Sequence, residues 1–253
     1  MKSALVVDLG LVEYGAAWEL QRRLVAARKV DAVPDVLLLC EHPHVITLGR
    51  GGKLGNLRAP ENVLHQMGVS FFETDRGGDI TYHGPGQLVG YPILNLASIR
   101  RDVAWYVRSL EEAMMRATAE FGIAPKRVSG RTGVWVDVEK RNKEEEETQK
   151  VKDEEKLGAI GVHLSRWVTS HGFAYNVSTD LRYFDLIVPC GIAGKRATSL
   201  EQLLGRGVEM KEASSRIAAH LGEIFGLDLR ASGRDALDAL LQPFEERTAL
   251  AAV

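Results

Sequence analysis

The sequence has little of what marks secreted, membrane-spanning or nucleic-acid-binding proteins. Its 253 residues include only two cysteines, Cys40 and Cys190, so a framework of several disulfides is excluded. The net charge is −2, and no large positive field indicates nucleic acid or an anionic membrane surface as a partner. Apolar runs are the length of strands, far below the roughly 20 residues that span a bilayer. We therefore expect a cytoplasmic protein without nucleic-acid or membrane partners.

Several catalytic motifs are also missing. No G-x-G-x-x-G segment opens a helix, and no G-x-S-x-G segment is present. Neither Gly52-Lys53 nor Gly194-Lys195 is followed by the Ser or Thr of a phosphate-binding loop. His42 and His44 lie two residues apart, but no second cluster of metal ligands accompanies them. Common nucleotide-binding, hydrolase and metal sites are therefore not expected.

The residues that are present predict one domain over 1–253 with an α+β fold. Strand patterns follow one another from 69 to 95 and from 133 to 177, which favours a mixed or mostly antiparallel sheet with helices on one side. Strands are predicted at 4–9, 35–41, 44–48, 69–74, 79–82, 87–95, 133–138, 157–165 and 168–177. Helices are predicted at 14–29, 102–121 and 210–226, and the chain after about 230 is expected to be peripheral.

One segment, 139–155, differs from the rest in composition. It contains five Lys or Arg, eight Asp or Glu and one aliphatic residue, so it cannot bury apolar surface. Strand patterns flank it on both sides. We interpret it as a charged insertion at the tip of a hairpin.

The segment 75–87 combines four glycines with polar side chains. Paired glycines allow backbone amides to approach a ligand closely, and Arg76, Tyr82, His83 and Gln87 lie beside them. A glycine-rich hairpin without a ligand is the alternative. The crowding of four such side chains favours a binding site.

The two cysteines differ in their surroundings. Cys40 ends the apolar run 36–39, which is typical of a buried side chain. Cys190 lies between a proline and a glycine, which indicates an accessible turn and leaves a nucleophilic role open. A thiol nucleophile needs a nearby cation or base, and a histidine or Lys156, which follows the charged segment, could supply it.

Five segments together resemble the lipoyl(octanoyl) transferases, which transfer octanoyl groups from acyl carrier protein to proteins. They span residues 36–204 and follow the order found in that family. The segments are Glu41-His42-Pro43-x-Val45-x-Thr47-Leu48-Gly49-Arg50, Arg76-Gly77-Gly78-x-x-Thr81-Tyr82-His83-x-x-Gly86-Gln87, Lys156-x-x-Ala159-Ile160-Gly161, His171-Gly172-Phe173-Ala174-x-Asn176-Val177 and Pro189-Cys190-Gly191-Ile192 with Thr198-Ser199-Leu200.

The resemblance implies a fold similar to the catalytic domain of biotin and lipoate protein ligases. It implies that Cys190 holds the octanoyl group as a thioester, that Lys156 favours the thiolate and moves protons, and that no cofactor or metal takes part. The residues that it implies for substrate binding are Arg76, Gly77, Gly78, Asp79, Ile80, Thr81, Tyr82, His83, Ala159, Ile160, Gly161, Gly172, Phe173 and Ala174. The implied donor is octanoyl-acyl carrier protein, and the implied acceptors are lipoyl domains of 2-oxoacid dehydrogenase complexes and the glycine cleavage H protein.

Three other readings stay open on the sequence. An ATP-dependent lipoate or biotin ligase would share the fold and need no cysteine, and a carrier-binding relative would have no activity. A related transferase acting between carrier proteins would reuse the cysteine. The charged insertion leaves Lys140 as a competitor of Lys156, and the spacing to Ala159 favours Lys156. We further hypothesise that the insertion affects docking of the carrier protein.

Overall fold

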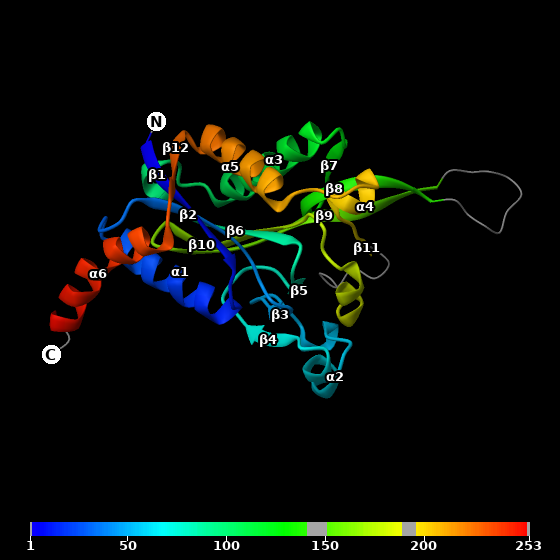
Figure 1. Ribbon diagram of the computed structural model, residues 1–253, viewed down its shortest axis with the longest axis horizontal. Coiled ribbons are helices and arrows are strands. Elements are labelled where there is room, and N and C mark those ends of the chain that lie inside the picture. The colour runs from blue at the N-terminus through cyan, green and yellow to red at the C-terminus, as the bar shows by residue number, and fades with distance from the viewer. Residues whose placement is uncertain (1, 141–150, 189–195, 252–253) are drawn as a thin grey trace, which may run out of the picture.

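The computed structural model describes residues 2–140, 151–188 and 196–251 (Figure 1). The strands are β1 (Lys2–Leu11), β2 (Asp35–Glu41), β3 (Val45–Leu48), β4 (Ser70–Glu73), β5 (Ile80–His83), β6 (Gln87–Ile93), β7 (Pro125–Val128), β8 (Arg131–Lys140), β9 (Val151–Ser165), β10 (Val168–Asn176), β11 (Arg196–Ala197) and β12 (Leu227–Ser232). The α-helices are α1 (Tyr14–Arg28), α2 (Glu61–Gln66), α3 (Val103–Glu120), α4 (Leu200–Leu204), α5 (Met210–Phe225) and α6 (Arg234–Ala251). Short 3₁₀ helices are η1 (Leu54–Asn56), η2 (Leu96–Ser98) and η3 (Leu181–Leu186).

Two sheets organise the chain. The larger has the strand order β12-β1-β2-β6-β10-β9-β8-β7, with β11 beside β9. Strand β1 is parallel to β12 and β2, and β11 is parallel to β9, whereas the other neighbours are antiparallel. The smaller sheet has the order β4-β3-β5 and carries part of the glycine-rich segment. The predicted α+β class with a mixed, mostly antiparallel sheet is confirmed.

Helices cover both faces of the large sheet, so the expectation that they lie on one side is wrong. Figure 1 shows α3 and α5 on one face and α1 on the other. The middle strands β6 and β10 are buried along their whole length, and such strands need a cover on each face. One core contains Tyr106, Leu110, Met114, Ile217 and Leu221 from α3 and α5, and the other contains Leu20, Leu24, Leu237 and Leu241 from α1 and α6.

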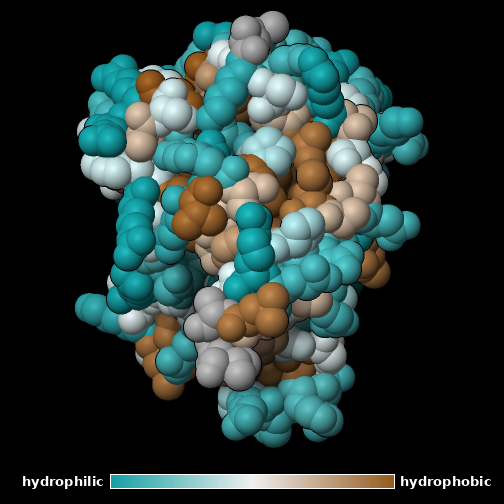
Figure 2. Space-filling model, turned by 90° about the vertical axis from the view of Figure 1, so that its left-hand side faces the viewer, coloured by the Kyte–Doolittle hydropathy of each residue, from teal (hydrophilic) through white to brown (hydrophobic). Residues whose placement is uncertain are grey.

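The C-terminal region is not peripheral, which corrects the second expectation about the layout. Strand β12 extends the large sheet by pairing with β1. Leu237 and Leu241 lie four residues apart on one face of α6, and both are fully buried in the core that this helix shares with α1. Figure 2 looks onto the end of the molecule at the left of Figure 1, where hydrophilic side chains cover most of the surface between small hydrophobic groups. Within the described ranges, no helix is long and apolar enough to cross a bilayer.

The charged segment continues the sheet at both ends, so its predicted limits of 139–155 are too wide. Strand β9 begins at Val151, and residues 139–140 pair with residues 151–152. Lys126 Nζ lies 2.6 Å from Asp137 Oδ1 and 2.9 Å from Glu154 Oε1. Lys126 on β7 thus pairs with a carboxylate of its neighbour β8 and with one of β9 beyond it, and such ion pairs between strands support polar stretches of a sheet. Only residues 141–150 lie outside the described structure at this point.

Candidate active site

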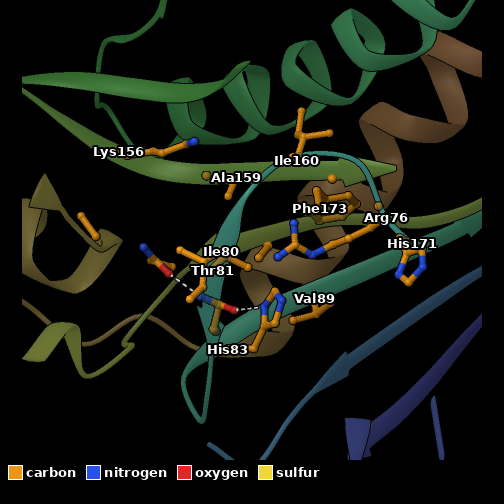
Figure 3. Close-up of a pocket in the computed structure, with 18 of the residues that line it drawn as sticks. Arg76, Ile80, Thr81, His83, Val89, Lys156, Ala159, Ile160, His171 and Phe173 are labelled. Carbon is orange, nitrogen blue, oxygen red and sulfur yellow. Dashed lines mark hydrogen bonds between the residues drawn. The ribbon is translucent and has the colours of Figure 1, made fainter. Parts of the chain in front are cut away.

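A cavity lies where the small sheet meets the middle of the large sheet (Figure 3). The predicted residues that line it are Arg76, Gly78, Asp79, Ile80, Thr81, His83, Lys156, Ala159, Ile160, Gly161, Gly172, Phe173 and Ala174. They come from the connection between β4 and β5, from β5 itself, and from β9 and β10. The structure therefore brings together three segments that are far apart in the sequence.

Gly77 and Tyr82 are predicted site residues that support the wall of the cavity without lining it. The Gly77 N–H donates to the Val162 carbonyl at 2.9 Å, and this hydrogen bond attaches the glycine-rich turn to β9. A Cβ at Gly161 would lie 2.9 Å from the Gly77 oxygen, so a side chain at Gly161 would push this turn away. Tyr82 is fully buried in the small sheet, and its hydroxyl lies 2.7 Å from His44 Nδ1.

Arg76 holds the glycine-rich turn through its guanidinium. The side chain is 7% exposed, and it donates to the Thr47 carbonyl at 2.6 Å and to the Gly77 carbonyl at 3.1 Å. The neighbouring Asp75 accepts a hydrogen bond from His171 Nε2 at 2.7 Å, and this bond lowers the pKa of Asp75 to about 2. Figure 3 places Arg76 and His171 at the opposite end of the cavity from Lys156. This end is therefore held by charged and hydrogen-bonded groups.

A chain of hydrogen bonds connects His83 to the backbone at Lys156. Gln87 Nε2 donates to Asn176 Oδ1 at 2.9 Å, so Gln87 Oε1 is free to accept from His83 Nδ1–H at 2.7 Å. Asn176 Nδ2 donates to the Thr198 carbonyl, and the Thr198 N–H donates to the Lys156 carbonyl, both at 2.9 Å. Burial lowers the pKa of His83 to about 3. His83 is therefore neutral, with its proton on Nδ1 and a lone pair on Nε2.

Lys156 reaches the cavity because β9 contains a β-bulge. Val134 pairs with Gly158 and Trp135 pairs with Lys156, so Leu157 has no opposite residue of its own. The extra residue reverses the alternation of side chains along the strand. Leu157 is buried in the core beneath α3, and Lys156 joins Trp135 at the cavity. The Lys156 Nζ lies 5.3 Å from the centre of the Trp135 ring, within the range of a cation–π contact.

The structure separates the competing lysines and describes one of the two cysteines. Lys140 ends β8 and pairs with Val151, at the far end of the hairpin from the cavity. Cys40 is 2% exposed, and burial raises the pKa of its thiol well above the usual range. Cys190 lies outside the described residues. The described chain on both sides of it borders the cavity, at Phe184 before and at 196–197 after.

Comparisons with known proteins identify the family of the chain. The family model for the lipoyl protein ligase A/B catalytic domain matches residues 13–222. An octanoyltransferase from Solibacter usitatus (strain Ellin6076) is 49% identical over 229 residues, which are 90% of this chain and 96% of that protein. An octanoyltransferase from Koribacter versatilis (strain Ellin345) is 48% identical over 87% of this chain and 83% of its own. The chain belongs to the octanoyltransferase family.

Solved structures of lipoate protein ligases have the same fold as this member of the octanoyltransferase family. A bipartite lipoate protein ligase from Thermoplasma acidophilum, solved in a study of its lipoylation system with the E2 lipoyl domain, superimposes with a TM-score of 0.71. The sequences are 14% identical, and the match covers 96% of this chain and 92% of that one. Lipoate-protein ligase A bound with ATP gives a TM-score of 0.67 at 14% identity, covering 96% of this chain and 94% of that one. The predicted likeness to lipoate protein ligases is confirmed at the level of the fold.

Other residues of the octanoyltransferase cavity were not among the substrate-binding residues that the resemblance implied. These are Tyr14, Gln87, Val89, Tyr91, Trp135, Gly158, His171, Asn176, Phe184, Arg196 and Ala197. Alternation along the predicted strand 87–95 would have placed Val89 and Tyr91 on one face with Gln87. Trp135 could not be found in this way, because its relation to Lys156 depends on the bulge. Tyr14 comes from α1, and no local pattern places that helix beside β5.

Buried histidines make the stability of this octanoyltransferase family member dependent on pH. Burial lowers the pKa of His42 to about 4, as it lowers that of His83 to about 3, whereas an unfolded histidine titrates near 6.5. Below about pH 6.5 the unfolded state therefore binds protons that the folded state does not. These two histidines alone are expected to lower the free energy of unfolding by up to about 2.7 kcal/mol per pH unit between pH 6 and 5. Partial burial lowers the pKa of His44 and His163 as well, which acts in the same direction.

Urea denaturation at pH 7, 6 and 5 measures this dependence. His83→Gln is the informative variant, because it removes one of these protons and should reduce the slope by up to about 1.4 kcal/mol per pH unit. A free energy of unfolding that stays constant from pH 7 to 5 would contradict the neutral, buried state of both histidines.

Proposed function

We propose that the chain transfers an octanoyl group from octanoyl-acyl carrier protein to the ε-amine of a lysine on a lipoyl domain, through a thioester on Cys190. The observation that carries this proposal is the position of Lys156, which lines the same cavity as Phe184 and residues 196–197, the described chain on either side of Cys190. The sequence identity to octanoyltransferases supports the choice of acyl group. The acceptors would be lipoyl domains of 2-oxoacid dehydrogenase complexes and the glycine cleavage H protein, modified in the cytoplasm.

In the first half-reaction, the Cys190 thiolate attacks the carbonyl carbon of the donor thioester. The bond between that carbon and the sulfur of the carrier breaks, and a new thioester forms on Cys190. The leaving thiolate takes a proton from the Lys156 ammonium and departs as a thiol. Because a thioester is already an activated acyl donor, this step consumes no nucleotide.

In the second half-reaction, the neutral ε-amine of the acceptor lysine attacks the thioester on Cys190. The bond between the acyl carbon and the Cys190 sulfur breaks, and an amide forms. The Lys156 amine accepts the proton that the attacking nitrogen loses. The thiolate of Cys190 and the ammonium of Lys156 are then restored together, so one proton cycles through Lys156 in each turnover.

Small side chains in the cavity would accommodate the acyl chain. Ala159 pairs with Ala174 across β9 and β10, and both residues line the cavity. In Figure 3 the Ala159 side chain points towards Ile80 and Thr81. Burial of each methylene of an acyl chain contributes about 0.8 kcal/mol. The eight-carbon chain would therefore gain several kcal/mol from this apolar space.

Replacement of Ala159 by leucine is expected to shorten the preferred acyl chain. Leucine adds three carbons, and loss of burial for two or three methylenes lowers kcat/KM for octanoyl donors about 30-fold, at about 0.8 kcal/mol each. Butanoyl donors should lose less than threefold, because their chain ends before the blocked space. The measurement compares kcat/KM for the two donors in both proteins. An equal loss for both chain lengths would show that Ala159 does not bound the acyl site.

A transfer assay without ATP tests the proposal as a whole. The purified protein is incubated with octanoyl-acyl carrier protein and an unmodified lipoyl domain, and the mass of the lipoyl domain is measured. We expect octanoylation of its acceptor lysine with no ATP present. Modification only from free octanoate and ATP would show that the chain acts as a ligase. The structural likeness to ligases concerns the fold alone. A protein that binds the carriers and gives no product under either condition would be a non-catalytic relative.

A further inference from the structure

Gly133 lies directly against the stem of Lys156. Its φ angle is +126°, a conformation that other residues rarely adopt. A Cβ at this position would lie 2.4 Å from the Gly158 carbonyl oxygen and 2.7 Å from Lys156 Cε. A side chain at position 133 would therefore displace either the bulge in β9 or the lysine itself. The backbone of Gly133 forms the wall that defines the path of the lysine side chain.

A buried carboxylate on the opposite face of the sheet holds Gly133 in place. Glu111 of α3 is fully buried, and its Oε1 accepts a hydrogen bond from the Gly133 N–H at 2.9 Å. Its Oε2 accepts from Arg108 Nη1 at 2.6 Å and from Arg127 Nε at 3.0 Å. The two oxygens thus have different partners, since Oε2 accepts hydrogen bonds from the arginines and Oε1 accepts one from the glycine. Such an arrangement satisfies a charge that would be costly to bury alone.

The contacts of Glu111 and of Lys156 meet at one stretch of backbone. Gly133 precedes Val134 and Trp135, the two residues that pair across the bulge with Gly158 and Lys156. The hydrogen bond from Gly133 fixes the strand that faces the bulge, and Trp135 on that same strand lies under the ammonium. A displacement of Gly133 would therefore change both the space for the lysine stem and the ring beneath its charge.

We propose that Glu111 is a positioning residue for Lys156, acting through the N–H of Gly133. The carboxylate does not touch the cavity; it holds the glycine that leaves the lysine its space at the bulge. This inference rests on the role proposed for Lys156 in the transfer reaction. It goes beyond that role by assigning the orientation of the lysine to a residue of α3, on the far side of the sheet.

Three variants of the full chain separate positioning from stability. Glu111→Ala removes the acceptor for the Gly133 N–H, and we expect kcat for transfer to fall at least tenfold with less than a twofold change in KM for the donor. Glu111→Gln keeps a single acceptor oxygen, for which Arg108 and Arg127 compete with the Gly133 N–H, so we expect a kcat between those of the unmodified protein and Glu111→Ala. Arg108→Ala is the matched control, because it removes a partner of the same carboxylate and leaves the bond to Gly133; kcat should change less than twofold.

Alkylation of Cys190 by iodoacetamide provides a readout that a purely structural role would not move. In a Cys40→Ala background, Cys190 is the only cysteine left in the sequence, so the measured alkylation is that of Cys190 alone. We expect Glu111→Ala and Lys156→Met to slow alkylation at pH 7 and to match the unmodified protein at pH 10, with Arg108→Ala unchanged at both. Gly133→Ala disturbs the same contact directly, so it should show the same slowing if Glu111→Ala does not fold.

The outcomes distinguish the inference from the function on which it rests. If Lys156→Met is impaired while folded Glu111→Ala, or Gly133→Ala in its place, behaves like Arg108→Ala in kcat and in alkylation, the positioning role is overturned and the proposed function stands. If Lys156→Met itself leaves both measurements unchanged, the proposed function of the lysine fails first. A loss of kcat and slower alkylation in Glu111→Ala and in Lys156→Met, with both measurements unchanged in Arg108→Ala, supports the positioning role.

Discussion

We expect the Cys190→Ser variant to transfer octanoyl groups at least about 1000-fold more slowly than the unmodified protein. A thiol beside a cation ionises near neutral pH, whereas a serine hydroxyl does not, so the variant lacks the nucleophile of the first half-reaction. The rate of transfer from octanoyl-acyl carrier protein to a lipoyl domain measures the loss. Thermal unfolding of the variant should be close to that of the unmodified protein, because one atom is exchanged.

Cys40→Ala is the matched control for this prediction. The Cys40 sulfur lies 3.6 Å from His42 Nε2, which superficially resembles a catalytic pair. Cys40 is 2% exposed, however, and His42 Nε2 also lies 2.7 Å from the Tyr91 hydroxyl. Burial keeps the thiol protonated, so its removal should leave the transfer rate within threefold. Loss of transfer in Cys40→Ala, together with normal transfer in Cys190→Ser, would identify Cys40 as the nucleophile instead.

Lys156→Met should lower kcat by about 100- to 10,000-fold, the range that proton transfer by a positioned side chain contributes. Methionine fills a similar volume next to Trp135 and removes only the group that gives and takes the proton. Lys156→Arg should restore little activity, because a guanidinium does not release its proton at the pH of the reaction. Single-turnover assays of each half-reaction should show a loss in both, since the same proton is used twice.

Lys140→Met is the control for the lysine assignment. In the sequence Lys140 competes with Lys156, and the spacing to Ala159 favours Lys156. The structure places Lys140 at the end of β8 and Lys156 at the cavity. The Lys140 variant should transfer octanoyl groups at the normal rate. Full activity in Lys156→Met together with a loss in Lys140→Met would reverse the assignment.

The fold could be predicted from the sequence wherever the pattern is local. The helix α3 begins after Asp102, whose side chain accepts from the Trp105 N–H at 2.9 Å, and its apolar stripe is visible in the sequence. The parallel pairing of β12 with β1 joins the two ends of the chain, so no local pattern indicates it. The helix α6 contains Pro243, and a proline inside a helical pattern argues against a helix in the sequence. The helix nevertheless forms and buries Leu237 and Leu241.

The candidate site was predictable as a set of segments but not as a geometry. The glycine-rich segment and the strands β9 and β10 do meet at one cavity. Strict alternation, however, would place Lys156 on the face opposite Ala159, in the core beneath α3. The bulge at Leu157 brings it to the cavity instead, and the support from Gly133 and Glu111 depends on contacts between strands and a helix. Such contacts leave no trace in the spacing of residues along one segment.

Intact-mass spectrometry after incubation with octanoyl-acyl carrier protein tests the central claim most directly. We predict an octanoyl adduct on the protein without ATP, released by hydroxylamine and mapping to Cys190 after proteolysis. The adduct should be absent from Cys190→Ser and present in Cys40→Ala. An unchanged mass, together with ATP-dependent transfer from free octanoate to a lipoyl domain, would contradict the acyl-enzyme and with it the proposed function.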